Sequence, residues 1–358
     1  MIKFTNKRES KRIMGREPAW EGVQTLKGKE YVLMKILIEG KNLENYYAKE
    51  HESFKNGLKA LFDARCYGEG YPGYDENIRT FTQMKEAIFP NEDIQLLILF
   101  GALNPHHIED GFAYEGLSEL KCKKAILLND FWSEAEAHRE AYFRFVEENN
   151  IDYVISLFRA PFHMWEGTPI HDRLIFRPTC IDPKIFNDWG CKKYDVGNLN
   201  AGIFGGDKFY PERAAFHNKL LEMDDISYFY AKHPGSGMHA PETPLIGKNF
   251  SIAINQCKIF VTSGNLIYRN FACKHAEIMA SNSLMMSNEP MDAEMLGLID
   301  GVNYVTIDET NIQDKIRYYL AHEDERLRIA QRGYALVMER YTSFAVAAYV
   351  YRQILEKE

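Results

Sequence analysis

The chain has 358 residues, enough for two domains of ordinary size that each bury a core. Hydrophobic residues make up 46% and charged residues 26%, a balance that excludes a disordered protein, a disulfide-rich miniprotein and a fibrous repeat. The formal charge is −8, from 43 Lys and Arg against 51 Asp and Glu, so a broad basic face for nucleic acid is disfavoured.

The six cysteines are scattered and form no C-x-x-C pair, which indicates free thiols in a reducing compartment. No apolar run approaches the ~20 residues of a membrane span, and the N-terminus lacks the apolar stretch of a signal peptide. We therefore expect a cytoplasmic protein without a transmembrane segment, for which peripheral contact with a membrane stays open.

The first half alternates between apolar segments and segments of helical periodicity. Residues 1–33 are polar and locally basic, so we expect an extension outside the folded domains. From Met34 onward, this alternation predicts a parallel sheet covered by helices. The expected strands are 34–40, 94–100, 124–128 and 153–158, with helices within 43–61, 78–87 and 134–148.

The alternation of apolar and helical segments stops at 172–192. Two prolines and a Trp-Gly pair there indicate the interdomain connection. A second series of the same kind follows it. Its expected strands are 195–199, 227–231, 258–262, 283–286 and 304–307, and its helices 212–222, 248–256, 270–280, 312–322, 323–340 and 343–355. The expected domains are therefore 34–175 and 176–342, followed by a last helix in 343–358.

Several signatures of known chemistry are absent. Residues 68–73 match G-x-G-x-x-G, but Pro72 lies inside the motif and the motif does not follow the first strand, so a turn is predicted. The sequence contains no P-loop, no G-x-S-x-G and no H-E-x-x-H. It also lacks the Asp-x-Asp pair that would hold a divalent ion against a diphosphate. We expect no metal and no other cofactor.

A candidate anion site follows the strand expected at 258–262. Ser263, Gly264 and Asn265 form a small-residue loop, and a helix begins shortly after it, with Arg269 at its start and Lys274 on it. Backbone N–H groups and the helix dipole favour a phosphate at such a position, although an ordinary strand-to-helix turn explains the pattern as well. Glu277, two turns into the helix, either binds a ribose diol or pairs with Lys274.

Further basic residues follow other strands of the second half. Lys208 and Arg213 border a glycine-rich turn that leads into a helix, and His233 lies in a loop after the next strand. The carboxyl ends of parallel strands meet at one edge, where open α/β sheets bind ligands. We therefore group these residues with the loop at 263–265 as nucleotide-binding candidates.

With these motifs, the second half resembles the GT-B glycosyltransferases, and among them the spore-maturation-type branch of "glycosyl transferases group 1". The segments that carry the resemblance are 177–186, 194–196, 210–213, 249–259, 274–281 and 315–333, within residues 175–356. The resemblance implies an α/β fold of two Rossmann-like parallel-sheet domains that face each other across a cleft. The donor would bind the C-terminal domain, the acceptor the N-terminal one, and the last helix would cross back onto the N-terminal domain. It also implies that Glu277 contacts the ribose and that Lys274 is the preceding basic residue of the motif.

Three positions depart from the family pattern. Asn282 replaces a glycine, Lys274 replaces the commoner arginine, and Arg269 replaces the first glutamate of the E-x7-E pattern of retaining relatives. The stereochemical outcome and the donor-sugar contacts stay open for that reason.

We therefore expect a hexosyltransferase-type glycosyltransferase that moves a sugar from a nucleotide-sugar to a hydroxyl of a glycan, a cell-envelope polysaccharide or a small molecule. Positive charge must stabilise the leaving diphosphate, and Lys208, Arg213, Arg269 and Lys274 can supply it. Candidates for a catalytic base follow strands of the first half: His106, His107, Asp130 and His163. The alternatives are a GT-B-type sugar-nucleotide epimerase and a catalytically silent GT-B binding module.

Overall fold

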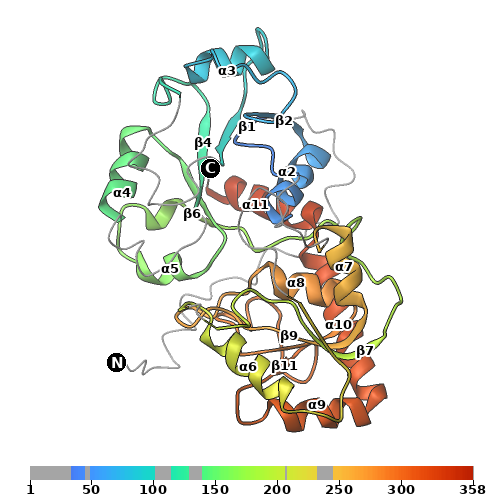
Figure 1. Cartoon of the computed structure of the whole chain (residues 1–358). Coiled ribbons are helices and arrows are strands. Elements are labelled where there is room, and N and C mark those ends of the chain that lie inside the picture. The colour runs from blue at the N-terminus through green and yellow to red at the C-terminus, as the bar shows by residue number, and fades with distance from the viewer. Residues whose placement is uncertain are drawn as a thin grey trace.

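The structure, a computed structural model, describes residues 34–44, 49–100, 114–128, 139–205, 208–231 and 245–357. The strands form two separate sheets, and each sheet with its helices makes one lobe of the molecule (Figure 1). The extension expected at residues 1–33 lies outside the described residues. No helix in the described part of the chain is long and apolar enough to cross a membrane.

The N-terminal lobe is built on a six-stranded sheet in the order β2-β1-β3-β4-β5-β6, in which every neighbouring pair is parallel. Its strands are β1 (Lys35–Glu39), β2 (Asp63–Tyr67), β3 (Leu96–Leu99), β4 (Lys123–Leu128), β5 (Tyr153–Ser156) and β6 (Leu174–Phe176). Its helices are α2 (Glu50–Leu61), α3 (Phe81–Ile88), α4 (Arg139–Glu148) and α5 (Ala160–Met164). The expected parallel sheet of this half is confirmed.

Two strands of this sheet escaped the sequence analysis. β2 is an edge strand whose Arg65 side chain is 42% exposed, so its charged residues hide the apolar alternation. β6 has only three residues and ends two residues before Pro178, so it was counted with the interdomain connection. The turn predicted at residues 68–73 is confirmed, since Gly68, Gly70 and Gly73 all adopt positive φ.

The C-terminal lobe has a five-stranded parallel sheet in the order β11-β10-β9-β7-β8. Its strands are β7 (Tyr194–Asn198), β8 (Tyr228–Tyr230), β9 (Cys257–Val261), β10 (Leu284–Ser287) and β11 (Val305–Thr306). Its helices are α6 (Pro211–Leu221), α7 (Lys248–Asn255), α8 (Cys273–Ala280), α9 (Ile312–Ala321) and α10 (Glu323–Arg340). These elements follow the predicted series closely, except that the helix expected from residue 270 begins at Cys273.

The last helix, α11 (Ser343–Lys357), returns to the N-terminal lobe and packs against α2, as Figure 1 shows. Val346, Ala347, Val350 and Ile354 lie in one hydrophobic cluster with residues of α2 and the first sheet. Gly57 of α2 is essential to this contact, because a Cβ there would lie 2.1 Å from the Ser343 carbonyl oxygen. The two helices therefore meet at backbone distance.

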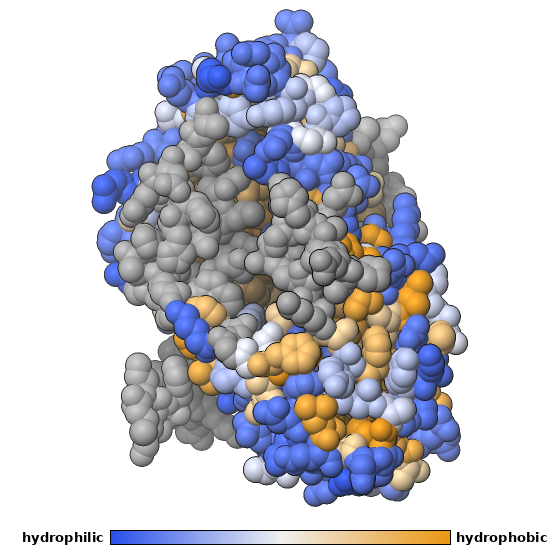
Figure 2. Space-filling view, in the orientation of Figure 1, coloured by the Kyte–Doolittle hydropathy of each residue, from blue (hydrophilic) through white to orange (hydrophobic). Residues whose placement is uncertain are grey.

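The two chain crossings between the lobes are joined to each other. The Ile181 N–H donates to the Tyr341 carbonyl at 2.9 Å, and the Ser343 N–H donates to the Ile181 carbonyl at 2.8 Å. Exposed large apolar side chains gather mainly on the C-terminal lobe, which carries more orange than the other lobe in Figure 2.

Candidate functional site

A layer of buried polar side chains lies at the carboxyl edge of the second sheet. We call it the polar layer, and its members are Asn198, Asn200, Thr262, Ser263, Asn265 and Asn288. Asn200 donates to the Val261 carbonyl at 2.8 Å and accepts from the Thr262 hydroxyl at 2.7 Å. Buried polar groups cost free energy unless they are paired, so this layer must be built as a network.

The sequence analysis identified Ser263 and Asn265 of this layer and missed Asn198, Asn200 and Asn288. Asn198 ends β7, Asn200 lies two residues after it, and Asn288 directly follows β10. Position at a strand end was therefore the signal that could have found them.

The loop after β9 is fixed by contacts within itself and by one from the end of β10. The Gly264 N–H donates to Asn288 Oδ1 at 2.9 Å, and Asn265 Oδ1 accepts from the Tyr268 N–H at 2.8 Å. A Cβ on Gly264 would lie 2.6 Å from the backbone carbon of Arg269, so glycine is required for this close approach. These contacts belong to a strand-to-helix turn, and the Gly264 amide is used by Asn288.

One polar group of this loop keeps its bonding capacity. The Ser263 hydroxyl is fully buried and has no hydrogen-bond partner in the described part of the chain. A buried hydroxyl without a partner is costly, so it marks a place where a ligand can supply the missing bond.

Arg269 lies just before α8 with φ of 44° and an exposed side chain. Its backbone is held on both sides, because its N–H donates to the Asn265 carbonyl at 3.0 Å and its own carbonyl accepts from the Met291 N–H at 2.9 Å. A left-handed non-glycine residue that is fixed in this way stores strain, a feature that clusters at functional sites. The same geometry delays the start of α8 to Cys273.

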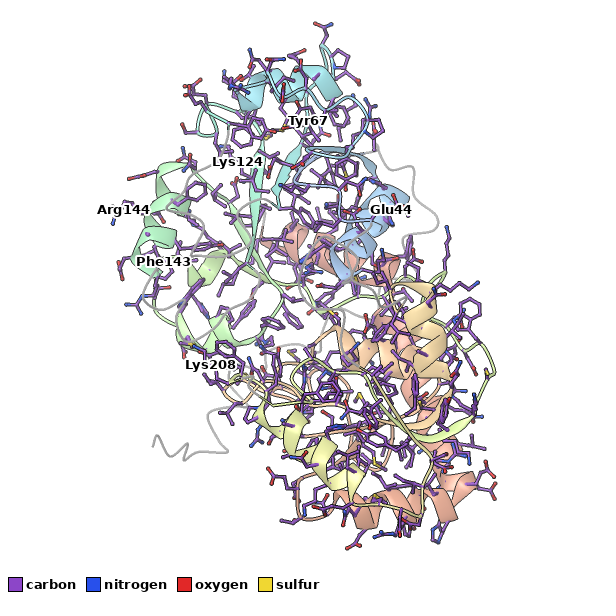
Figure 3. All side chains as sticks on the ribbon, in the orientation of Figure 1. Glu44, Tyr67, Lys124, Phe143, Arg144 and Lys208 are labelled. Carbon is purple, nitrogen blue, oxygen red and sulfur yellow. The ribbon has the colours of Figure 1, made fainter. Side chains whose placement is uncertain are left out.

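Arg213 braces the site from α6. Its Nη2 and Nε donate to the Ser263 carbonyl at 2.9 and 3.3 Å, and its guanidinium lies 3.6 Å from the Tyr210 ring centroid. Through these contacts Arg213 connects the loop before α6 with the loop after β9. Its positive charge lies at the carboxyl edge of the second sheet. Lys208 is exposed, and Figure 3 places it at the edge of the C-terminal lobe that faces the N-terminal lobe.

Lys274 and Glu277 form a nearly buried ion pair on α8, with Nζ and Oε2 3.1 Å apart and side chains 12% and 9% exposed. The Lys274 ammonium also lies 3.6 Å from the Phe250 ring centroid. Burial lowers the pKa of Lys274 against the opposing charge of Glu277, and Arg213 lowers it further. The ion pair that the sequence offered as an alternative to the ribose contact is thus present.

Two other residues of the same motif have structural roles. His275 is fully buried, and its Nδ1 accepts from the Ala272 N–H at 3.1 Å while its Nε2 donates to the Ser287 hydroxyl at 3.0 Å. Burial lowers the pKa of His275 to about 3, so the ring is neutral. Asn282 adopts φ of 49° and donates to Asp188 at 2.8 Å. Asparagine tolerates this conformation better than other non-glycine residues, which explains its place where the family has glycine.

The start of α8 faces a carboxylate of the other lobe. The Cys273 thiol donates to Glu50 Oε2 at 3.7 Å, and Glu50 at the start of α2 is ion-paired with Arg177. Both charged side chains are buried, at 4% and 1% exposure. The sequence analysis missed Glu50 and Arg177, because their relation to α8 depends on how the lobes meet.

Of the four candidate bases, His163 lies among the described residues, whereas His106, His107 and Asp130 lie outside them, as does His233. His163 is half exposed and bonds through Nε2 to Asp292 Oδ2 of the opposite lobe at 3.1 Å. Within the described ranges, no group of three His, Cys, Asp or Glu side chains is placed to hold a metal ion.

Comparison with known proteins adds a family and a fold. Residues 241–352 match the family described as glycosyl transferase-like. The fold is similar to that of HepE from Anabaena in complex with UDP-glucose, at 10% identity and a TM-score of 0.58, over 90% of this chain and 100% of that one. It is also similar to sucrose-phosphate synthase from Thermosynechococcus elongatus, at 12% identity and a TM-score of 0.57, over 91% and 100% of the two chains.

A glycosyltransferase from Rickettsia africae has a similar fold as well, at 10% identity and a TM-score of 0.59, over 92% of this chain and 100% of that one. No curated protein matches the sequence. The two parallel-sheet lobes and these similarities together show a GT-B fold. The family match lies mainly within the C-terminal lobe, which therefore carries a glycosyl transferase-like region.

Proposed function

We propose that the chain is a glycosyltransferase that takes its sugar from a uridine diphosphate donor, bound at the carboxyl edge of the second sheet, and transfers it to an acceptor hydroxyl. The observation that carries the proposal is the Ser263 hydroxyl, which has no partner among the described residues and belongs to a residue whose carbonyl accepts from Arg213, in the loop that leads to α8. The choice of UDP is supported by HepE, a structure of similar fold that is in complex with UDP-glucose.

The chemistry requires positive potential on the donor side. Breaking the anomeric C–O bond leaves negative charge on the nucleoside diphosphate, and preorganised charges at that position lower the barrier. Arg213 and Lys274 are held there by buried contacts, and Lys208 and Arg269 are exposed at the same edge. The sequence has no Asp-x-Asp pair, so we propose that these side chains do the work without a protein-bound metal or another cofactor.

Glu277 is proposed to bind the ribose of the donor. A carboxylate has four lone-pair positions, so the bond to Lys274 at Oε2 leaves capacity for a diol. The ion pair also fixes the rotamer of Glu277 before the nucleotide arrives, which lowers the entropy cost of binding.

We further propose that the donor domain is 176–342, that the acceptor domain is 34–175, and that the last helix at 343–358 makes the two interdependent. The proposed acceptor is a glycan, a cell-envelope polysaccharide or a small molecule, and the proposed compartment is the cytoplasm. The packing of α11 on α2 supports the division, because it ties the end of the chain to the acceptor lobe.

The test is titration calorimetry of UDP against wild type, Glu277→Ala and Glu323→Ala. The control breaks an i, i+3 ion pair of the same kind, Glu323 with Arg326 at 2.7 Å, on a helix that carries none of the donor residues. Loss of the ribose bonds is expected to weaken UDP binding by ~1–3 kcal/mol in Glu277→Ala. Glu323→Ala should bind UDP as wild type does.

Equal UDP affinity in both variants would remove Glu277 from the site. A wild type that binds no nucleotide in a thermal-shift panel of UDP, GDP, ADP and dTDP would refute the proposed donor class. An isomerised sugar nucleotide, formed without any acceptor, would show the epimerase reaction instead.

A further inference from the structure

A carboxylate of the C-terminal lobe meets two basic side chains of the N-terminal lobe. Asp292 lies in the segment after β10, while Arg159 and His163 lie at the start of α5 and within it. Asp292 Oδ2 is 3.1 Å from His163 Nε2 and 3.5 Å from Arg159 Nε. Figure 1 shows α5 on the side of its lobe that faces the C-terminal lobe.

Asp292 is tied to the proposed donor site through its own backbone. The preceding residue, Met291, donates its N–H to the Arg269 carbonyl at 2.9 Å, at the end of the loop that contains Ser263 and Gly264. Asp292 adopts φ of 56°, a left-handed conformation held by this segment. The carboxylate therefore has a fixed position relative to the donor loop, and so does the imidazole that it bonds.

We propose that His163 is the base that takes the proton of the acceptor hydroxyl, and that Asp292 is a positioning residue that orients it from the opposite lobe. The proposal rests on the proposed function. In the tautomer whose Nε2–H donates to Asp292, the lone pair of Nδ1 is left as acceptor. The side chain is 54% exposed, so Nδ1 can be reached by a substrate in the space between the lobes.

The transfer step forms one bond, breaks another and moves one proton. The acceptor oxygen bonds to the anomeric carbon while the bond from that carbon to the diphosphate oxygen breaks, and its electron pair leaves with the nucleoside diphosphate. The acceptor proton moves to Nδ1, and the resulting imidazolium is stabilised by the ionised Asp292. The imidazolium later returns the proton to solvent.

Asp292 is suited to remain ionised. Burial alone would raise its pKa, but the hydrogen bond and charge of His163, together with the charge of Arg159, hold the pKa of Asp292 below its ordinary range. Arg159 in turn packs on Phe162, with its guanidinium 4.2 Å from the ring centroid. Among the described residues, Asp292 and Arg159 are the charged groups that face His163.

The base and its orienting group lie on different lobes. The imidazole is held in its working tautomer and direction only while the lobes are together. The acceptor would therefore be activated only while the lobes are together.

The experiment compares wild type with Asp292→Asn, His163→Gln and the control Glu294→Gln. Asparagine tolerates the positive φ at position 292, and Glu294 is an exposed carboxylate two residues further along the same segment. The probe is UDP-glucose with water as the acceptor. The readouts are UDP release between about pH 5 and 9, and the UDP dissociation constant from calorimetry.

We expect wild-type UDP release to rise with pH along a limb in the range where imidazoles titrate. His163→Gln should lower the rate by about 10²–10⁴-fold and abolish the limb. Asp292→Asn should lower the plateau at least about tenfold without changing the UDP dissociation constant, because the imidazolium formed at proton transfer loses its anionic partner. Glu294→Gln should match wild type, and all variants should bind UDP equally well.

A limb retained in His163→Gln would overturn the proposal. An unchanged plateau in Asp292→Asn, or a lowered plateau accompanied by weakened UDP binding, would overturn it too, since Asp292 would then have no role or would only join the lobes. A wild type that binds UDP but releases none from UDP-glucose at any pH also counts against the base. A wild type without affinity for UDP overturns the donor and the base together, whereas normal UDP affinity with unchanged profiles overturns the base alone.

Discussion

Replacing Glu50 by Gln is expected to destabilise the protein far more than loss of a surface charge would. The Glu50 and Arg177 side chains are 4% and 1% exposed, so the pair lies in the fully buried regime. Removing one partner leaves the Arg177 charge buried and uncompensated, which costs about 3–5 kcal/mol. The substitution also weakens the bond that Glu50 accepts from the Cys273 thiol of the other lobe.

The assay is urea unfolding followed by circular dichroism, with Asp225→Asn as the matched control. Asp225 pairs with Arg317 at 2.8 Å, but both side chains are 47% exposed, so little change is expected there. The double variant Glu50→Gln, Arg177→Met should be less destabilised than the sum of the single variants by at least about 1 kcal/mol. If Glu50→Gln lowers the free energy of unfolding by less than about 1 kcal/mol, the reasoning is refuted, because breaking a buried ion pair costs more than that.

Two further outcomes follow from the same structure. Gly264→Ala should weaken UDP binding in calorimetry about tenfold or more, because a Cβ 2.6 Å from the Arg269 backbone must displace the donor loop; unchanged affinity would place UDP elsewhere. The pKa of His275 is lowered to about 3 in the folded state, below the unfolded value of ~6.5, so the unfolded chain binds an extra proton and stability falls as pH drops below ~6.5. At pH 5 this loss is about 2 kcal/mol, and His275→Gln, which can keep the bond to the Ala272 N–H, should show a shallower decline in urea unfolding between about pH 7.5 and 5. Equal declines would contradict it.

Secondary structure could be predicted well where the signal is local. Strands such as β3 and β10 are short runs of buried apolar residues, and α10 shows helical periodicity along its length, so neighbours in the sequence suffice. The prediction failed at β2 and β6, which are an edge strand with charges and a three-residue strand. Both depend on neighbours in the sheet for their conformation, which periodicity does not record.

The donor side of the candidate site was also partly visible in the sequence. Ser263 and Gly264 lie in one strand-to-helix turn, and Lys274 with Glu277 are one helical turn apart, so a contiguous pattern identifies them. The pattern did not show that the Gly264 N–H donates to Asn288, or that Arg213 donates its hydrogen bonds to the carbonyl of a loop residue. Those partners come from other strands.

The sequence by itself determined the class of fold, the two α/β series and the residues of the donor loop, because these depend on local spacing and on parallel strands that share one edge. Only the tertiary structure decided which groups meet between the lobes. Glu50 reaches Cys273 across 223 residues and His163 reaches Asp292 across 129. Contacts at such separations depend on the packing of α11 and on the relative orientation of two sheets, and no local pattern specifies either.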